Sequence, residues 1–597
     1  MIQRLSIWQA REAAVPIVLV VTHNKIKTAA WISIPDFREV CKAVDSEIRE
    51  EFSGIFAQER TLDKAMDYVD ALSDPGVRGN SWCIGERCGY ATPGPVQSLV
   101  GENKWDPAGM WDRIAAIAGR LAEEDCENDP LGPGVIVDET AQAKRGMATA
   151  GVAHQYAGCA GGVVNCINWV FLTMAGPFMR TWAGCGLYIP EKAWFTGRGE
   201  TGTARRKSAG VPARTRFATK PEIARKLFRR LRRNGVKFNY AAGDEVYGRS
   251  GPLRRDHERN REAYAYFVPR DFRVDVPGKG RMKLDDLLEH ADPVFEERSA
   301  GPGQKGLRYY EWALIALKSK RHCILVRRPC GQPWGNPAIL EVNAAADAPG
   351  DPAERDRVKD EKITFCLCFI PESSPIEPSM RNLVFMAGRR WAAEEGNETG
   401  KGPIGWDENQ LRKFGSLQKH TALAGLAMLR SNLIASRLAA RTTAEPPPAA
   451  TDDGSASLTG KSSGKAGERG RQVRTGKHVS IPLGDSLVPV SGDHERPQGI
   501  GYVRLSRNEI MRLRNAVMSG ASDSEIEFHV EFSNWRRRHQ AIARWHHHAR
   551  RLRSAALASR EAAPEGQPRK VTRRPGTAST GSPAKGNRKR GGNHPTT

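Results

Sequence analysis

The sequence predicts a mixed α/β fold, with a helical region before the sheet and a basic, low-complexity region after it. Three observations predict this fold class. Residues 36–130 carry apolar side chains at helical spacing, and residues 131–271 change to strand-like runs bounded by glycines. Residues 442–498 are rich in Pro, Ser, Gly, Ala and Lys, which is typical of a disordered linker. A chain of 597 residues is also too long for one ordinary core, so several units are expected.

The N-terminal part divides into an extension and a helical unit. Residues 1–35 form an extension of uncertain structure, whose apolar run Val15–Val21 is too short to cross a membrane. Residues 36–130 predict a helical N-terminal domain, because FREVCKAVDSEIREEFSGIF and AGMWDRIAAIAGRLAEE both repeat apolar residues at helical spacing.

Residues 131–271 predict the first part of a sheet core. The runs GVIVD, VVNCINWVFLTMA and MRTWAGCGLYIP are rich in β-branched and aromatic residues and predict strands. KPEIARKLFRRLRRNG predicts a helix that ends at Gly235. KFNYAAGDEVYG and AYAYFVPR then predict two further strands, so strands and helices share one domain.

The remainder of the chain continues this domain and then leaves it. Residues 272–380 predict a β-rich insertion, with strands at ILVRR, AILEV and ITFCLCFIP. Residues 381–441 predict the last part of the core, with a helix over 383–401 and another over LQKHTALAGLAMLRSNLIASRLAA. The C-terminal region is divided into a disordered linker, a helical basic island and a disordered basic tail, at residues 442–498, 499–555 and 556–597.

The charge of the chain favours a polyanionic partner. The formal net charge is +23 and the sequence pI is about 9.7. Residues 535–597 contain 16 Lys or Arg against two Glu, so most of the excess lies there. Such a segment binds phosphates without reading sequence, whereas a solvated charge run is the plainer alternative. The predicted DNA-binding side chains are those of WRRRHQAIAR, namely Arg536, Arg537, Arg538 and Arg544.

The cysteines indicate a reducing compartment. Eleven cysteines are scattered along the chain without paired CxxC units, so no zinc site is predicted. We therefore expect reduced thiols, a cytosolic location and no membrane partner.

Two predicted strands end on acidic residues, Asp138 in GVIVDET and Asp244 in GDEVYG. Carboxylates at a sheet edge can hold two hard divalent cations roughly 4 Å apart, the arrangement that phosphodiester chemistry requires. A single acid after a strand is more often a solvated turn residue. Because adjacent strand residues point to opposite faces, we expect Glu139 to face away from the metals.

A third carboxylate lies in the segment GRRWAAEEGNETGKG. On a helix, Arg390, Glu394 and Lys401 fall on one face, and Glu395 points away by about 100°. The basic side chains are expected to contact phosphates or to hold the glutamate in place. Because Gly is a poor helix residue, costing about 1 kcal/mol relative to Ala, the helix is predicted to end near Thr399.

Taken in order, several motifs resemble one known family. VIVDET, KRG, GVAHQYAG, FATKPE, GDEVYG and RRWAAEE together resemble the insertion-sequence transposases of the DDE superfamily, most like the seven-hundred-and-one insertion-sequence family. The resemblance runs from about Phe56 to Ala440 and resumes at WRRRHQAIAR. Related families carry a Tyr-x2-Arg-x3-Glu-x6-Lys signature; here the Tyr position is Ala387, and His154 stands where Arg is more usual.

The resemblance implies a ribonuclease-H-like mixed sheet core. It matches Asp138 and Asp244 to the two catalytic aspartates and Glu394 to the catalytic glutamate, all three as metal ligands, with Arg390 and Lys401 supporting them at the DNA phosphates. The expected cofactor is Mg²⁺, as two ions, with Mn²⁺ able to substitute.

The implied partner is double-stranded DNA, both transposon ends and target, bound by a homodimer. The helical N-terminal domain would contact the ends, and the location would be the nucleoid of the bacterial cytoplasm. Two alternatives stay open: a decayed or domesticated transposase that only binds DNA as a regulator, and a nuclease that cuts without joining strands.

Overall fold

The structure is a computed structural model, and it describes 34–196, 200–291, 293–303, 306–330, 363–443 and 505–533, with 535, 536 and 540. All described residues lie in one compact unit. Along this part of the chain, none of the helices is both long enough and apolar enough to cross a membrane. The predicted domain boundaries stay predictions. The extension up to residue 33, the linker from residue 444 and the basic tail lie outside the described residues.

The strands lie where most of the β-branched runs predicted them. Their bounds are β1 Gly134–Ala143, β2 Ala153–Ala157, β3 Gly162–Ala175, β4 Arg180–Tyr188, β5 Tyr240–Gly243, β6 Ala263–Val268, β7 Arg273–Val276, β8 Gly280–Lys283, β9 Glu296–Gly303, β10 Gly306–Ala316, β11 His322–Arg328 and β12 Thr364–Phe369. The strand expected at AILEV lies outside the described residues.

Helices precede, interrupt and follow the strands. Their bounds are α3 Ile34–Ser53, α4 Glu59–Leu72, α5 Ser81–Arg87, α6 Gly94–Val100, α7 Pro107–Asp125, α8 Glu191–Trp194, α9 Glu200–Ser208, α10 Lys220–Arg233, α11 Glu245–Gly248, α12 Gly251–Arg259, α13 Leu284–Ala291, α16 Met380–Gly388, α17 Trp391–Lys401, α18 Phe414–Thr443 and α19 Arg507–Met518, with the 3₁₀ turns η1 Gly158–Ala160 and η2 Trp406–Glu408. The helix predicted over 383–401 is therefore two helices, α16 and α17.

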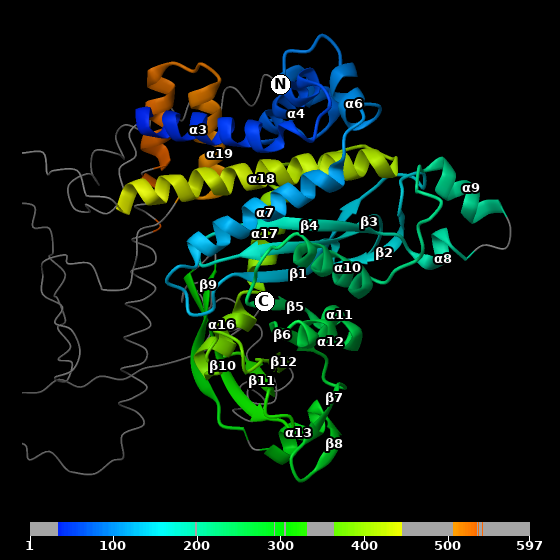
Figure 1. Cartoon of the computed structure of the whole chain (residues 1–597), viewed down its shortest axis with the longest axis vertical. Coiled ribbons are helices and arrows are strands. Elements are labelled where there is room, and N and C mark those ends of the chain that lie inside the picture. The colour runs from blue at the N-terminus through cyan, green and yellow to red at the C-terminus, as the bar shows by residue number, and fades with distance from the viewer. Residues whose placement is uncertain are drawn as a thin grey trace, which may run out of the picture. The chain divides into compact units, whose positions relative to one another are not determined.

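Ten of the strands form one mixed sheet, in the order β2-β3-β1-β5-β6-β12-β11-β10-β9, with β4 also paired to β3 (Figure 1). β1 pairs antiparallel with β3 and parallel with β5, and β5 pairs parallel with β6. β1 and β5 run the same way, with Val137 opposite Gly243, so the carboxyl end of β5 lies beside the middle of β1, which continues to Ala143.

The predicted β-rich insertion extends this sheet. β12 pairs antiparallel with β6, with Phe365 opposite Val268, and β11, β10 and β9 follow outward in turn. Only β7 and β8 form a separate two-stranded sheet among the described residues. A hydrophobic core therefore continues from the parallel strands into the inserted ones, and Ala265, Cys366 and Leu325 belong to one buried cluster.

The two faces of the sheet bury different helices. Ile136 is packed in a core cluster with Ala392 and Ala393 of α17, whereas Val135 and Val137 belong to the cluster that contains Phe228 of α10. This is the alternation expected along a strand buried on both sides. α17 and α10 thus lie on opposite faces of β1.

α17 continues to Lys401, two residues beyond the predicted end near Thr399. The reason is packing. A methyl group at Gly400 would lie 2.2 Å from the Trp182 ring of β4, and one at Gly396 would lie 3.4 Å from Thr173 of β3. The glycines let the helix approach the sheet closely, and this contact offsets their low helix propensity.

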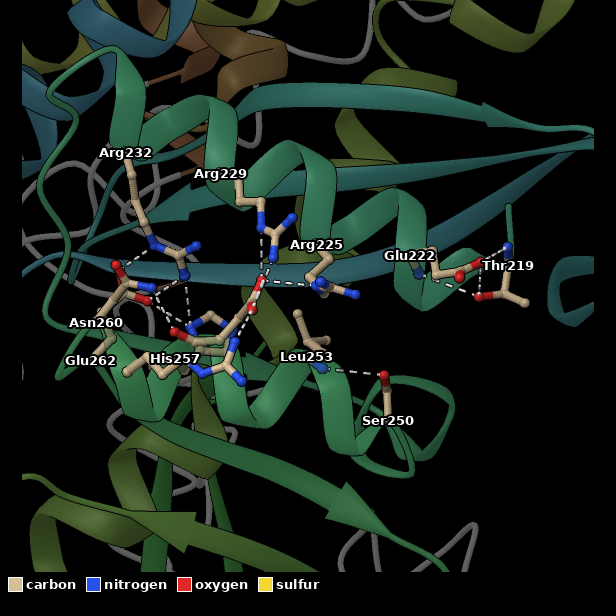
Figure 2. Close-up of polar contacts among 12 residues, drawn as sticks. Thr219, Glu222, Arg225, Arg229, Arg232, Ser250, Leu253, His257, Asn260 and Glu262 are labelled. Carbon is tan, nitrogen blue, oxygen red and sulfur yellow. Dashed lines mark hydrogen bonds and ion pairs between the residues drawn. The ribbon is translucent and has the colours of Figure 1, made fainter. Parts of the chain in front are cut away.

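Ion pairs fasten α10 to α12 on the other face (Figure 2). Asp256 is almost fully buried and accepts hydrogen bonds from Arg225 and Arg229, at 2.9 and 3.0 Å between Nε and Oδ2. Burial alone would raise the pKa of Asp256, but these hydrogen bonds lower it. A complete capping box between Thr219 and Glu222 begins α10. The first turn of α10 is therefore held in a defined position.

The helical regions at both ends of the described chain pack together through α18. α18 lies beside α7 and α3, as Figure 1 shows, and also contacts α4 and α19. Arg514 of α19 bonds Asp45 of α3 and Asp70 of α4, at 2.6 and 2.9 Å between Nη2 and the carboxylate oxygens. The beginning of the predicted basic island is thus part of the folded unit.

Candidate metal centre

Three carboxylates meet where β5 ends beside the middle of β1. Asp138 and Glu139 follow Val137 in β1, and Asp244 follows Gly243, the β5 residue opposite Val137. One oxygen from each carboxylate lies within 4.8 Å of the other two. The structure therefore brings Asp138 and Asp244 together, and their role as metal ligands stays a prediction.

The position of the Glu139 carboxylate differs from the expectation that it faces away from the metals. Its neighbours confirm that it lies on the face opposite Asp138: Lys220 Nζ of α10 donates to Oε1 at 2.7 Å, and the Tyr247 hydroxyl donates to Oε2 at 2.8 Å. Its carboxylate nevertheless belongs to the cluster. β5 stops at Gly243 while β1 continues to Ala143, so beyond that point no parallel neighbour separates the two faces. A glutamate is long enough to reach Asp244 around that edge.

Backbone amides orient the two aspartates. The Glu139 N–H donates to Asp138 Oδ1 at 2.9 Å, and the Val246 N–H donates to Asp244 Oδ1 at 3.0 Å. The second bond makes Asp244 the N-cap of α11. These hydrogen bonds fix the orientation of both carboxylates.

The cluster is electrostatically poised for a cation. Burial, together with the charges of Asp244 and Glu139 and against the lowering effect of Arg390, raises the pKa of Asp138 to about 7. Burial, together with the charge of Glu139, raises the pKa of Asp244 to about 6. Close carboxylates that repel one another are what a divalent cation stabilises, and hard oxygen donors suit Mg²⁺. The residues present therefore fit the metal that the sequence implies.

Glu394 does not join this group in the structure. Its carboxylate forms an ion pair with Arg390, one turn earlier on the same helix. Among the described residues, the oxygens that converge within 4.8 Å are those of Asp138, Glu139 and Asp244. Arg390 is close enough to lower the pKa of Asp138 and of Asp244. Arg390 is therefore near both Glu394 and the two aspartates.

The other two predicted positions in this segment have different partners. Glu395 points away from Glu394 and pairs with Arg180 of β4. Lys401 Nζ donates to the carbonyl oxygen of Ala141 at 2.8 Å, which ties the end of α17 to β1. Lys401 thus supports the site through the backbone of the strand that carries Asp138.

Sequence reasoning missed two side chains of the site. Lys220 and Tyr247 hold Glu139 from either side of its carboxylate. Both belong to motifs noticed in the sequence, FATKPE and GDEVYG, to which no role was given. Two features of the sequence could have identified them: Lys220 lies at the start of a predicted helix, and Tyr247 lies three residues after Asp244.

The predicted DNA-binding arginines are only partly described. Arg536 bonds Glu509 of α19, at 2.9 Å between Nε and Oε1, and its Nη2 donates to Ser506 Oγ at 2.9 Å. Its guanidinium therefore donates to the side chains of the capping box that begins α19. Arg537, Arg538 and Arg544 lie outside the described residues, and DNA binding by this segment stays a prediction.

Comparisons with known proteins agree with the resemblance. Residues 91–284 match the family model of the DDE superfamily endonuclease. A probable transposase for insertion sequence element IS701 from Microchaete diplosiphon is 35% identical over 117 residues, which is 20% of this chain. The aligned stretch spans about a quarter, 26%, of that relative's length. The family match includes Asp138, Glu139 and Asp244 and ends before Glu394.

Proposed function

We propose that this chain, which carries a DDE superfamily endonuclease domain, is a DNA transposase of an insertion sequence. It would cleave DNA at the ends of its element and join the freed 3′ hydroxyl to target DNA. The convergence of Asp138, Glu139 and Asp244 where β5 ends beside the middle of β1, inside the matched region, carries this proposal. The sheet order β3-β1-β5-β6 around these acids supports a ribonuclease-H-like core.

Asp138 and Asp244 would hold two Mg²⁺ ions, which Mn²⁺ could replace. When bound, these ions supply Lewis-acid activation of the phosphodiester and of the attacking oxygen. The chain positions the ligands: backbone amides fix the aspartates, and Lys220 and Tyr247 fix Glu139. Glu139 thereby keeps a third carboxylate beside the pair.

Glu394 would complete the site by exchanging its partner. Its side chain and that of Arg390 are both partly exposed, at 34% and 28%, so both can rotate. When DNA and metal bind, Arg390 would transfer its hydrogen bonds from Glu394 to a phosphate, and the freed Glu394 carboxylate would turn to the metals. Guanidinium groups suit both partners, because they bind carboxylates and phosphates with the same fork geometry.

The proposal is tested with Asp138→Asn, which should abolish metal-dependent cleavage of duplexes carrying the element's ends and leave DNA binding nearly unchanged. Glu245→Gln is the matched control, because Glu245 is an exposed acid adjacent to Asp244 and outside the convergent group. Undiminished nicking by Asp138→Asn would refute the assignment.

Strand transfer needs its own assay. Wild-type protein given pre-cut ends and Mg²⁺ should join them to a target plasmid; cutting without joining would instead identify a nuclease. The homodimer and the nucleoid location in the cytoplasm stay predictions from the resemblance.

A further inference from the structure

We infer that a basic surface beyond the carboxylates binds the phosphate backbone of the DNA duplex held at the site. This inference rests on the proposed function and adds where the duplex lies. The surface, called here the basic rim, is defined by Arg145, Lys207 and Arg412, from three segments far apart in the sequence. All three side chains are exposed.

Hydrogen bonds hold the three segments of the rim together. The Ala150 N–H donates to the Arg412 carbonyl at 2.9 Å, and the Phe414 N–H donates to the Ala209 carbonyl at 2.9 Å. Arg205 of α9 donates to the Met147 carbonyl at 3.1 Å. The turn after β1, the end of α9 and the segment before α18 therefore form one continuous surface.

The composition of these segments is one-sided. Residues 143–152, 201–221 and 409–416 contain ten Lys or Arg and no Asp or Glu. Several of these cations form hydrogen bonds or ion pairs within the protein, as Lys220 does with Glu139. Within the part of the chain that the structure describes, Arg145, Lys207 and Arg412 have no side-chain hydrogen bond or ion pair.

A cluster of exposed cations without acidic neighbours repels itself, and a polyanion relieves that repulsion. The positions of these cations along rigid segments suit phosphates, which a duplex presents at regular intervals. Such contacts fix the position of a duplex without reading its bases.

The rim lies at a distance from the carboxylates that a duplex can span. β1 carries Asp138 and continues to Ala143, and the Lys144 N–H extends the pairing to Asn165 at 2.9 Å. At about 3.3 Å per residue, Arg145 lies roughly 20 Å beyond Asp138 along the strand. Since phosphates of one strand follow every 3.4 Å along the axis, this corresponds to about six base pairs from the cut.

A second connection joins the rim to the site. Residues 211–219, which carry the exposed Arg214 and Arg216, lead from α9 directly to Lys220, whose ammonium group bonds Glu139. Positive side chains therefore continue from the edge of the carboxylate cluster to the rim. A duplex with its scissile phosphate at Asp138 and Asp244 would follow this path.

The inference is tested by a triple variant, Arg145→Gln, Lys207→Gln and Arg412→Gln, in the full-length chain. The matched control is Arg233→Gln, Lys237→Gln and Arg261→Gln. These three cations are also exposed, but they lie near the opposite ends of β5 and β6. Binding of a labelled 40-base-pair duplex of mixed sequence is measured from 50 to 300 mM salt, in the Asp138→Asn background to prevent cutting.

Each phosphate contact contributes about 0.9 to the slope of log affinity against log salt. The rim variant should therefore reduce the slope by about 2 to 3, and the control by less than 1. On duplexes carrying the element's ends, the rim variant with Asp138 intact should also nick more slowly at 150 mM salt and recover at 50 mM.

Equal slopes for the rim and control variants would overturn the inference and leave the proposed function standing. A reduced slope in the rim variant, with no metal-dependent cutting by the wild-type chain, would refute the proposed function and keep the rim as a DNA surface. Matching melting temperatures of both variants and the wild type establish that the comparison is between folded proteins, and the single variant Arg145→Gln, expected to lower the slope by about 1, replaces the triple variant if it fails to fold.

Discussion

Replacing Asp138 by Asn should stabilise the metal-free protein at pH 8, the reverse of the usual effect of a substitution in a half-buried site. The folded chain raises the pKa of Asp138 to about 7 from an ordinary value of 3.8, chiefly through burial. The unfolded chain therefore releases the proton more readily than the folded one, and the free energy of unfolding falls as pH rises from about 4 to 7. Asn is neutral at every pH and avoids this loss, while its oxygen can still accept the Glu139 N–H.

The magnitude follows from the difference between the folded and ordinary pKa values of Asp138. Each pH unit of that difference corresponds to 1.36 kcal/mol, so the full penalty at pH 8 is about 4 kcal/mol. The pKa of Asp244 is also raised, to about 6, and the two aspartates titrate as a coupled pair, so the substitution should recover about 2 to 4 kcal/mol of this penalty. At pH 5 the ionisation of Asp138 stabilises the unfolded chain much less than at pH 8. The difference in the free energy of unfolding between the variant and wild type should therefore be less than half of its value at pH 8.

The assay is thermal or denaturant unfolding of wild type and Asp138→Asn at pH 5 and pH 8 in the presence of EDTA. We expect the melting temperature of the variant to exceed that of wild type by several degrees at pH 8. Adding Mg²⁺ should then raise the melting temperature of wild type and leave that of the variant almost unchanged. A variant that is less stable than wild type at pH 8 would refute the electrostatic reasoning.

The remaining predictions concern other parts of the site. Glu139→Gln should weaken Mn²⁺ binding roughly tenfold in calorimetry, because it removes a charge from the cluster; unchanged affinity would exclude Glu139 from the centre. Arg390→Gln should move the pH midpoint of Mn²⁺ binding upward, because Arg390 lowers the pKa of Asp138; a midpoint that stays or falls contradicts that contact. Gly400→Ala should lower the free energy of unfolding by about 1 to 3 kcal/mol, since its methyl would overlap an indole ring of β4, whereas Gly415→Ala, with open space around it, should be neutral or stabilising.

The strands and their acidic ends could be predicted from the sequence because they depend on local patterns. β-branched runs bounded by glycine identified β1 and β3, and the parallel pairing of β1 with β5 is what brings Asp138 beside Asp244. Alternation along a strand also placed Glu139 on the face opposite Asp138, but the expectation that Glu139 faces away from the site was wrong, because its carboxylate reaches the two aspartates. What alternation could not supply was the point at which β5 ends, and that point decides whether Glu139 can reach the cluster.

Long-range packing accounts for the other differences. The glycines of α17 predicted that the helix ends early. The helix continues because Gly400 packs closely against Trp182 of β4, a contact that the local sequence does not reveal. The inserted strands were predicted as strands, but their pairing with β6 joins residues about a hundred positions apart. The ion pair of Glu394 with Arg390 joins residues one helical turn apart and is local. The position of Glu394 relative to Asp138 instead depends on how α17 lies on the sheet.

The central claim is that the carboxylates in the middle of β1 and directly after β5 hold the ions used to cut DNA. Direct binding of Mn²⁺, followed by electron paramagnetic resonance at pH 8, tests it without any DNA. Asp138→Asn and Asp244→Asn should each lose bound Mn²⁺, and Glu245→Gln should bind as wild type does. Equal Mn²⁺ binding by wild type and both aspartate variants would contradict the claim.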